Sequence, residues 1–149
     1  MKKILFICLF ALVSSVSVFA VPRDVNEKVL KIFHEAFPDV KQPSWYTFDN
    51  YYEVYFTNAD NSSCRIDYNT DGTIMSTRRY YGASELSPFI KAKVNEKYPG
   101  KKIFGITEIS SEGEFTYHII LQDDKTVYNI KSDATGNINL ESKLHRAEQ

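Results

Sequence analysis

The sequence predicts an α+β fold in which antiparallel strands form a sheet and helices pack on one of its faces. Three observations support this prediction. Two segments carry apolar residues at spacings of three and four, as amphipathic helices do. Each segment precedes four short runs rich in β-branched and aromatic residues. The turns between these runs are so short that neighbouring strands must be antiparallel, so the chain is predicted to contain two tandem α-β-β-β-β units.

The first 20 residues have the layout of a cleavable secretory signal. Two lysines precede an apolar run over residues 4–13, and the small residues Val18 and Ala20 stand three and one positions before the expected cut. The run is shorter than the roughly 20 residues that cross a bilayer. We expect cleavage between Ala20 and Val21, a periplasmic or secreted location and no membrane insertion of the mature chain. An uncleaved anchor is the alternative.

The first predicted helix spans residues 24–37. Its apolar stripe consists of Val25, Val29, Ile32, Phe33, Ala36 and Phe37. Asp24 is expected to cap its start, with Glu27 three residues later in a box-like arrangement, and Pro38 is expected to end it. Strands are then predicted over residues 45–48, 51–57, 63–68 and 73–81.

A second helix is predicted from Leu86 to Tyr98, with Ser84 or Ser87 as its cap and Pro99 after its end. Strands are predicted to follow over residues 102–109, 115–121, 126–132 and 137–143. These landmarks match those of the first half in order and type. We therefore expect a first unit over residues 21–82 and a second over residues 83–149, together forming one compact domain.

Alternation along the strands predicts which side chains face the helices. The apolar set comprises Tyr52, Val54, Phe56, Ile66, Tyr117, Ile119, Leu121, Tyr128, Ile130, Ile138 and Leu140. The opposite side is expected to carry Arg65, Asp67, Asn129 and Lys131. Cys64 is the only cysteine outside the signal, so it cannot form an internal disulfide, and its alternation with Ile66 and Tyr68 predicts a buried core position.

The side away from the helices is unexpectedly aromatic. Tyr51, Glu53 and Tyr55 fall on it, and one of the neighbours Trp45 and Tyr46 must also point there. Exposed tyrosines combine a large ring, a hydroxyl and few rotatable bonds, which protein interfaces favour. Stacking of these rings across neighbouring strands is the structural alternative.

Other kinds of chemistry find little support. The formal net charge is −1 for the whole chain, without the clustered lysines and arginines that a nucleic acid partner requires. The histidines His34, His118 and His145 lack the spacing of metal ligands. The acidic pairs stand in predicted turns, and no glycine-rich phosphate loop or catalytic pair is present. We therefore expect no metal, no cofactor and no enzymatic activity.

The duplicated unit resembles the exported bacterial PepSY-like family, also described as β-lactamase-inhibitor-like. The likeness rests on the helix end Ala36-Phe37-Pro38, Trp45, the strand over residues 52–56, Ile66-Asp67-Tyr68 before Asp71-Gly72, and the repetition after Tyr98-Pro99. It implies tandem modules whose sheets form a continuous curved surface with helices on its back. In β-lactamase inhibitor proteins that surface grips an enzyme, and PepSY modules are associated with restraining secreted peptidases. The chain departs from those inhibitors in lacking their disulfides.

The leading hypothesis is a non-enzymatic periplasmic protein that binds a protein or peptide of the cell envelope, in the manner of an inhibitor. The expected contact residues are Trp45, Tyr46, Tyr51, Glu53, Tyr55, Arg79 and His118. The alternative is a carrier that holds a small apolar ligand in the concavity of the sheet.

Overall fold

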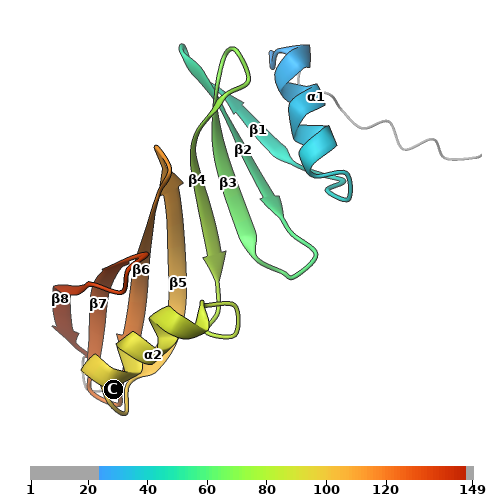
Figure 1. Cartoon of the computed structure of the whole chain (residues 1–149). Helices are drawn as coiled ribbons and strands as arrows, with labels where there is room; N and C mark the ends of the chain where they lie inside the picture. Colours follow the sequence, from blue (N-terminus) through green and yellow to red (C-terminus); the bar gives the residue numbers. More distant parts are fainter. Residues whose placement is uncertain (1–23, 147–149) are drawn as a thin grey trace, which may run out of the picture.

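The computed structural model describes residues 24–146, and the predicted secretory signal lies outside them. Two helices accompany one open sheet of eight antiparallel strands, so the α+β class is confirmed (Figure 1). In chain order the elements are α1 (Glu27–Ala36), β1 (Ser44–Thr47), β2 (Tyr51–Thr57), β3 (Ser63–Asn69), β4 (Ile74–Tyr81), α2 (Pro88–Lys97), β5 (Lys102–Ser111), β6 (Glu114–Gln122), β7 (Thr126–Asp133) and β8 (Ile138–His145). Each strand pairs with its neighbours in sequence. Within residues 24–146, no helix has the length and apolar character that a bilayer crossing requires.

The residue that caps the start of α1 differs from the prediction. Asn26, not Asp24, is the N-cap, and its side-chain oxygen accepts a hydrogen bond of 2.8 Å from the backbone N–H of Lys28. An asparagine is as good a cap as an aspartate, and its position directly before the first helical residue decides between them. At α2 the cap is Ser87, followed by Pro88 in the first turn.

Both helices end in the same way. Phe37 has φ −131° and ψ 65°, and Tyr98 has φ −128° and ψ 66°. Each donates its backbone N–H to the carbonyl four residues earlier and then leaves the helix. A proline follows each of them, and its ring excludes the helical conformation from the residue before it. The predicted role of the two prolines is therefore confirmed.

Two separate hydrophobic cores lie beneath the helices. The first contains Val25, Val29, Leu30, Phe33, Val54, Phe56, Cys64, Ile66 and Tyr68. The second contains Tyr81, Leu86, Ile90, Val94, Ile106, Ile119, Leu121, Ile130 and Ile138. Cys64 is buried as predicted, and burial raises the pKa of its thiol. Leu140 pairs with the core residue Ile130 and so faces the helix side as predicted, but it is 51% exposed because β8 is an edge strand.

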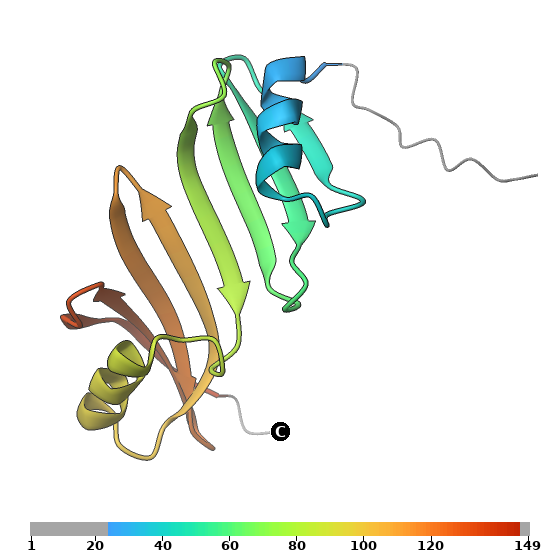
Figure 2. The same ribbon diagram turned by 45° about the vertical axis from the view of Figure 1, so that its right-hand side comes forward.

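Both helices lie on the same face of the sheet (Figure 2). The strand register shows this independently, because directly paired residues share a face. Cys64 of the first core pairs with Arg79, and Arg79 pairs with Glu108. Two residues further along the same strands, Tyr81 pairs with Ile106, and both belong to the second core. The opposite face, which we call the open face, carries neither helix.

A polar network separates the two cores on the helix face. Arg79 donates to Asp60 Oδ2 at 2.5 Å and to Ser62 Oγ at 3.2 Å, and its guanidinium lies 4.8 Å from the ring centre of Tyr81. Tyr81 in turn donates its hydroxyl to Glu108 at 2.6 Å. Burial and the neighbouring Glu108 carboxylate raise the pKa of Tyr81. The network ties the β2–β3 turn to β4 and β5, where the halves of the sheet join.

The turns that follow β3 and β7 place a glycine against each helix. Gly72 has φ +92°, and a Cβ added there would lie 2.5 Å from Cδ1 of Ile32 in α1. Gly136 has φ +83°, and its added Cβ would lie 3.0 Å from Cγ of Lys93 in α2. Only glycine adopts such φ values without strain and also allows this close approach.

We expect Gly72→Ala to lower the free energy of unfolding by about 2 kcal/mol, because it adds both backbone strain and a clash with Ile32. Gly82→Ala is the matched control. Gly82 has no atom within 4 Å of an added Cβ and no positive φ, so its substitution should change stability by less than about 1 kcal/mol. Urea unfolding measures both. Equal stability of the two variants would contradict the packing of this turn on α1.

The Asp60 carboxylate predicts a dependence of stability on pH. The hydroxyl and backbone N–H of Ser62, together with Arg79, lower the pKa of Asp60 to about 2 from its usual 3.8. Its stabilising contribution is therefore complete above the usual pKa and is lost as the pH falls from about 4 towards 2. The free energy of unfolding of Asp60→Asn should fall less steeply over this range than that of the natural protein.

The free energy of unfolding of Asp60→Asn should still fall with pH to some extent, because the pKa values of Asp123 and Asp133 are also lowered to about 2. Denaturant unfolding at several pH values between 5 and 2 measures the difference. Parallel curves for the two proteins would show that Asp60 makes no such contribution.

Candidate functional site

The open face of the first half is built from two rows of directly paired residues across β1 to β4. One row contains Tyr46, Glu53, Asp67 and Ser76, and the other contains Ser44, Tyr55, Arg65 and Arg78. Alternation sends both rows away from α1, because the residues between them, such as Val54 and Ile66, belong to the first core. The predicted sidedness of Arg65 and Asp67 is confirmed.

Four of the aromatic residues of the β1–β2 hairpin lie outside the first core and define what we call the aromatic edge: Tyr46, Phe48, Tyr51 and Tyr55. The rings of Tyr46 and Tyr55 meet edge to face with centres 5.7 Å apart, and those of Phe48 and Tyr51 stack at 4.4 Å. Tyr46 is 52% exposed, Phe48 43% and Tyr55 37%. The rings do stack across strands, as the structural alternative requires, yet they leave much of their area in solvent.

An ionic cluster of Glu53, Arg65, Asp67 and Arg78 lies next to the aromatic edge. Arg65 forms an ion pair with Glu53, donates from Nε to Asp67 Oδ1 at 3.2 Å and donates from Nη1 to the Tyr55 hydroxyl at 2.9 Å. The other Asp67 oxygen accepts a hydrogen bond of 2.6 Å from Ser76. Arg78 Nη1 lies 3.5 Å from that same oxygen.

The charges of this cluster are layered. Both carboxylates are buried, whereas the Arg65 and Arg78 side chains keep 24% and 32% of their surface exposed. Burial pulls the pKa of Arg65 down, but the hydrogen bond and charge of Asp67, with the charge of Glu53, outweigh it and raise that pKa. A molecule that approaches the open face therefore meets guanidinium groups and tyrosine rings first.

Several predicted contact residues lie elsewhere than expected. Tyr46, Tyr51 and Tyr55 share the aromatic edge, but Glu53 is only 5% exposed and lies in the buried layer of the ionic cluster. Trp45 faces α1, where its ring lies 5.2 Å from that of Phe33, because it pairs with the core residue Val54. Of the two neighbours, Tyr46 is therefore the one that points to the open face.

Arg79, also expected on the open face, instead lies on the helix face. It pairs with Cys64 and is held by Asp60, so its neighbour Arg78 is the residue on the open side. His118 does lie on the open face, with Nδ1 3.1 Å from Glu141, but on β6 in the second half. Strands β3 to β5 separate it from the aromatic edge.

Sequence reasoning missed Phe48, Arg65 and Arg78 as candidate contacts. Phe48 stands two positions after Tyr46, a spacing that places both on one side of a strand. The arginines gave a weaker signal, because their role depends on the carboxylates that the register brings opposite them.

The second half of the open face carries an apolar patch that the sequence analysis also missed. Ile120 lies between the core residues Ile119 and Leu121 and is 37% exposed, and Leu144 is 58% exposed. Val127 pairs directly with Leu144 and completes the patch.

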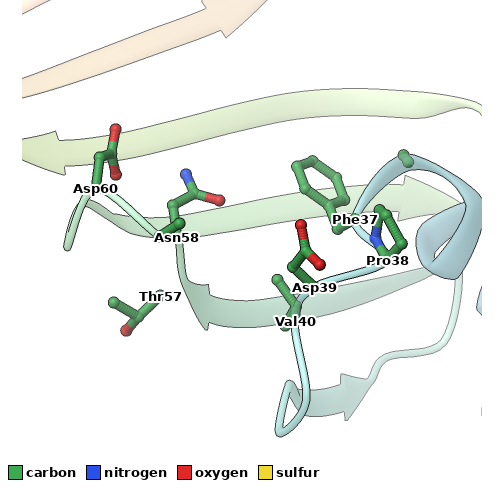
Figure 3. Close-up of a pocket in the computed structure, with 9 residues that line it drawn as sticks. Phe37, Pro38, Asp39, Val40, Thr57, Asn58 and Asp60 are labelled. Atoms are coloured by element: carbon green, nitrogen blue, oxygen red, sulfur yellow. The ribbon is translucent and has the colours of Figure 1, made fainter.

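A pocket of about 450 Å³ lies between the end of α1 and the β2–β3 turn (Figure 3). Residues 36–40 line one side of it and residues 57–60 the other. Phe37 and Val40 contribute apolar surface, and Asn58 and Asp60 contribute polar groups. Within the described part of the chain, no three histidine, cysteine or acidic side chains converge as metal ligands do.

No protein-family model matches this chain, and no curated protein matches it. Solved structures do. A BLIP-like protein from Bacteroides fragilis superposes with a TM-score of 0.62 at 12% identity, over 86% of this chain and 91% of that one. A DUF2874 family protein from Bacteroides ovatus superposes with a TM-score of 0.60 at 16% identity, over 81% of this chain and 87% of that one. A protein from Bacteroides eggerthii with a predicted periplasmic location superposes with a TM-score of 0.60 at 12% identity, over 81% of this chain and 88% of that one.

These similarities show the fold. The chain shares its architecture with BLIP-like and DUF2874 proteins. The expected architectural likeness to β-lactamase inhibitor proteins agrees with this result, whereas the descriptions of these three proteins and of a DUF2874 family protein from Bacteroides uniformis do not name PepSY.

We expect Arg65→Gln to lower the free energy of unfolding by about 3 kcal/mol, because it leaves the buried Glu53 carboxylate without its cation. The double variant Glu53→Gln/Arg65→Gln is the matched control, and it should recover part of this loss. Urea unfolding measures both. A loss below about 0.5 kcal/mol in Arg65→Gln would contradict a structural role for the buried layer.

Proposed function

We propose that this chain is a non-enzymatic binding protein of the periplasm that holds a protein or peptide partner on its open face. The observation that carries the proposal is the aromatic edge. Tyr46, Phe48 and Tyr55 expose large rings on a face that neither helix covers, although exposed positions of a sheet with one solvated face are normally polar.

The aromatic edge has the properties of interface residues. A tyrosine or phenylalanine buries a large area on binding while two side-chain torsions become ordered, and the tyrosine hydroxyl adds a hydrogen bond. The rings already order one another through the Tyr46–Tyr55 and Phe48–Tyr51 contacts. Binding would therefore cost little conformational entropy.

The two edge strands, β1 and β8, have features that hinder pairing with a strand of a partner, which favours binding of the partner on the open face. β1 has only four residues and follows Pro43 directly. β8 has a register shift in its pairing with β7 and carries the charged Lys143. Short strands, prolines, bulges and charges are the usual ways in which proteins block pairing at a sheet edge.

The location and the repeat belong to the same proposal. The lysine-led apolar run over residues 4–13 supports export, and the predicted periplasmic location of a structural neighbour is consistent with it. The element order repeats one helix and four strands, with a separate core under each helix. That order supports two PepSY-like units over residues 21–82 and 83–149. A BLIP-like structural neighbour supports a protein-binding role, with inhibition of a peptidase as one form of it.

A second candidate function is the transport of a small apolar ligand. The pocket beside Phe37 and Val40, with about 450 Å³, has the size of a small-molecule site, which begins near 300 Å³. It lies at the end of α1, away from the open face. Native mass spectrometry of the purified protein tests this candidate, since a carrier retains a bound molecule and a protein-binding module has its apo mass.

Site-specific photo-crosslinking tests the leading proposal. The mature protein is prepared with a photoreactive phenylalanine analogue at Tyr46 and, as a matched control, at Phe89 on α2. The two positions are equally exposed, at 52% and 51%, and lie on opposite faces. We expect an envelope extract to give a discrete adduct from position 46 and none from position 89.

Competition then shows whether the adduct depends on the aromatic edge. Unlabelled natural protein should suppress the adduct, whereas a Tyr46→Ser/Tyr55→Ser variant with an unchanged melting temperature should suppress it at least tenfold less well. Equal adducts from positions 46 and 89, or equal competition by the two proteins, would contradict the proposal.

A further inference from the structure

We propose that the partner offers an aspartate or glutamate side chain to Arg78, so that the open face recognises an acidic protein segment. This inference rests on the proposed function and names the chemistry of its partner. It starts from one side chain whose hydrogen-bonding capacity is unused in the ionic cluster.

Arg78 is unusual among the residues that the structure describes. Its Nη1 atom is buried and has no hydrogen-bond partner among them, and its other guanidinium nitrogens form no hydrogen bond with them either. The guanidinium stays close to Asp67 through charge alone, at 3.5 Å. Nη1 is enclosed and out of reach of a partner, but Nε and Nη2 are unpaired within residues 24–146 and not buried, and the side chain keeps 32% of its surface exposed. These two nitrogens can therefore donate to an acceptor that comes from outside.

The acceptors within the cluster are already occupied. Asp67 accepts from Arg65 at one oxygen and from Ser76 at the other, and Glu53 is paired with Arg65. Arg65 uses its Nε, Nη1 and Nη2 atoms on these groups and on Tyr55. Arg78 is therefore the guanidinium of this cluster whose donors remain available to a partner.

The neighbouring arginine on β4 shows the arrangement that Arg78 lacks. Arg79 donates to the carboxylate of Asp60 at 2.5 Å and to Ser62 at 3.2 Å. The two residues are adjacent in one strand but lie on opposite faces, and of the two only Arg79 forms hydrogen bonds within the described part of the chain. A carboxylate supplied from outside would give Arg78 the same kind of contact.

The positive charge on the outside of the ionic cluster and the exposed tyrosine rings beside it favour an acidic side chain that belongs to a protein segment. The carboxylates of Glu53 and Asp67 lie in the buried layer, so the charge presented outward by the cluster is positive. A guanidinium fork matches the two oxygens of a carboxylate. Tyr55 and Tyr80 on the same face are 37% and 39% exposed and offer rings against which the rest of a peptide can pack.

Selection from a peptide display library tests the inference even while the partner is unidentified. Random peptides of twelve residues, linear and disulfide-closed, are selected on the immobilised mature protein. The best binders are then synthesised with both termini blocked, so that side chains provide their only carboxylates. We expect aspartate and glutamate to be at least twofold enriched over the unselected library.

Affinities of the best peptide for variants give the decisive comparison. Arg78→Gln should weaken binding at least tenfold, and replacing the peptide's acidic residue by its amide should have the same effect, without an additive loss when both are combined. The affinity of Arg78→Lys for the peptide should lie between those of the natural protein and Arg78→Gln, because lysine keeps the positive charge but lacks the two-pronged guanidinium. Lys31→Gln on α1, which removes one positive charge from the helix face, should stay within twofold.

The outcomes separate this inference from the proposed function. A library without binders or without acidic enrichment, or an Arg78→Gln affinity within twofold of the natural protein, overturns the inference. The amide substitution in the peptide leaves the protein unaltered, so a folding defect in Arg78→Gln cannot imitate its effect. If Tyr46→Ser/Tyr55→Ser binds the same peptide undiminished, the proposed use of the aromatic edge fails instead.

Discussion

Each helix is ten residues long, and both lie on the same side of a sheet of eight strands. This one-sided coverage is the constraint on which the remaining features depend. It confines apolar burial to two patches, one beneath each helix, and it leaves between them a strip that hydrophobic packing does not fill. Arg79, Asp60 and Glu108 occupy that strip, and Glu108 accepts a hydrogen bond from Tyr81 of the second core, so polar contacts join the halves where β4 pairs with β5.

The same constraint leaves a full sheet face for side chains that need no helix above them. In the first half, that face has its own internal order. Arg65 holds two buried carboxylates and the hydroxyl of Tyr55, while the hairpin of β1 and β2 stacks its aromatic rings in pairs. The surface is therefore preorganised, with rings and guanidinium groups outermost. The second half presents an apolar patch around Ile120 and Leu144 on the same face, where His118 also lies beside Glu141.

Much of the fold could be predicted because short strands with alternating apolar residues and turn-rich connections leave few alternatives. Alternation assigns Val54, Ile66, Ile119 and Ile130 to the correct side for this reason. The site was less accessible to prediction. Residues 74–81 lack a clear alternation, and their pairing with β3 shifts register between Asp67 and Tyr68, so the faces of Arg78 and Arg79 could not be told apart. Trp45 and Tyr46 are both aromatic, and only the pairing with Val54 shows which of them faces the core.

In the proposed function, the partner covers the open face of the first half. Hydroxyl-radical footprinting of the purified protein, alone and in complex with the partner that crosslinking identifies, measures this most directly. We expect strong protection of Tyr46, Phe48 and Tyr55 in the complex, with unchanged oxidation of Phe89 on α2, which is as exposed as Tyr46. Protection of Phe89 with no change along the β1–β2 hairpin would contradict it.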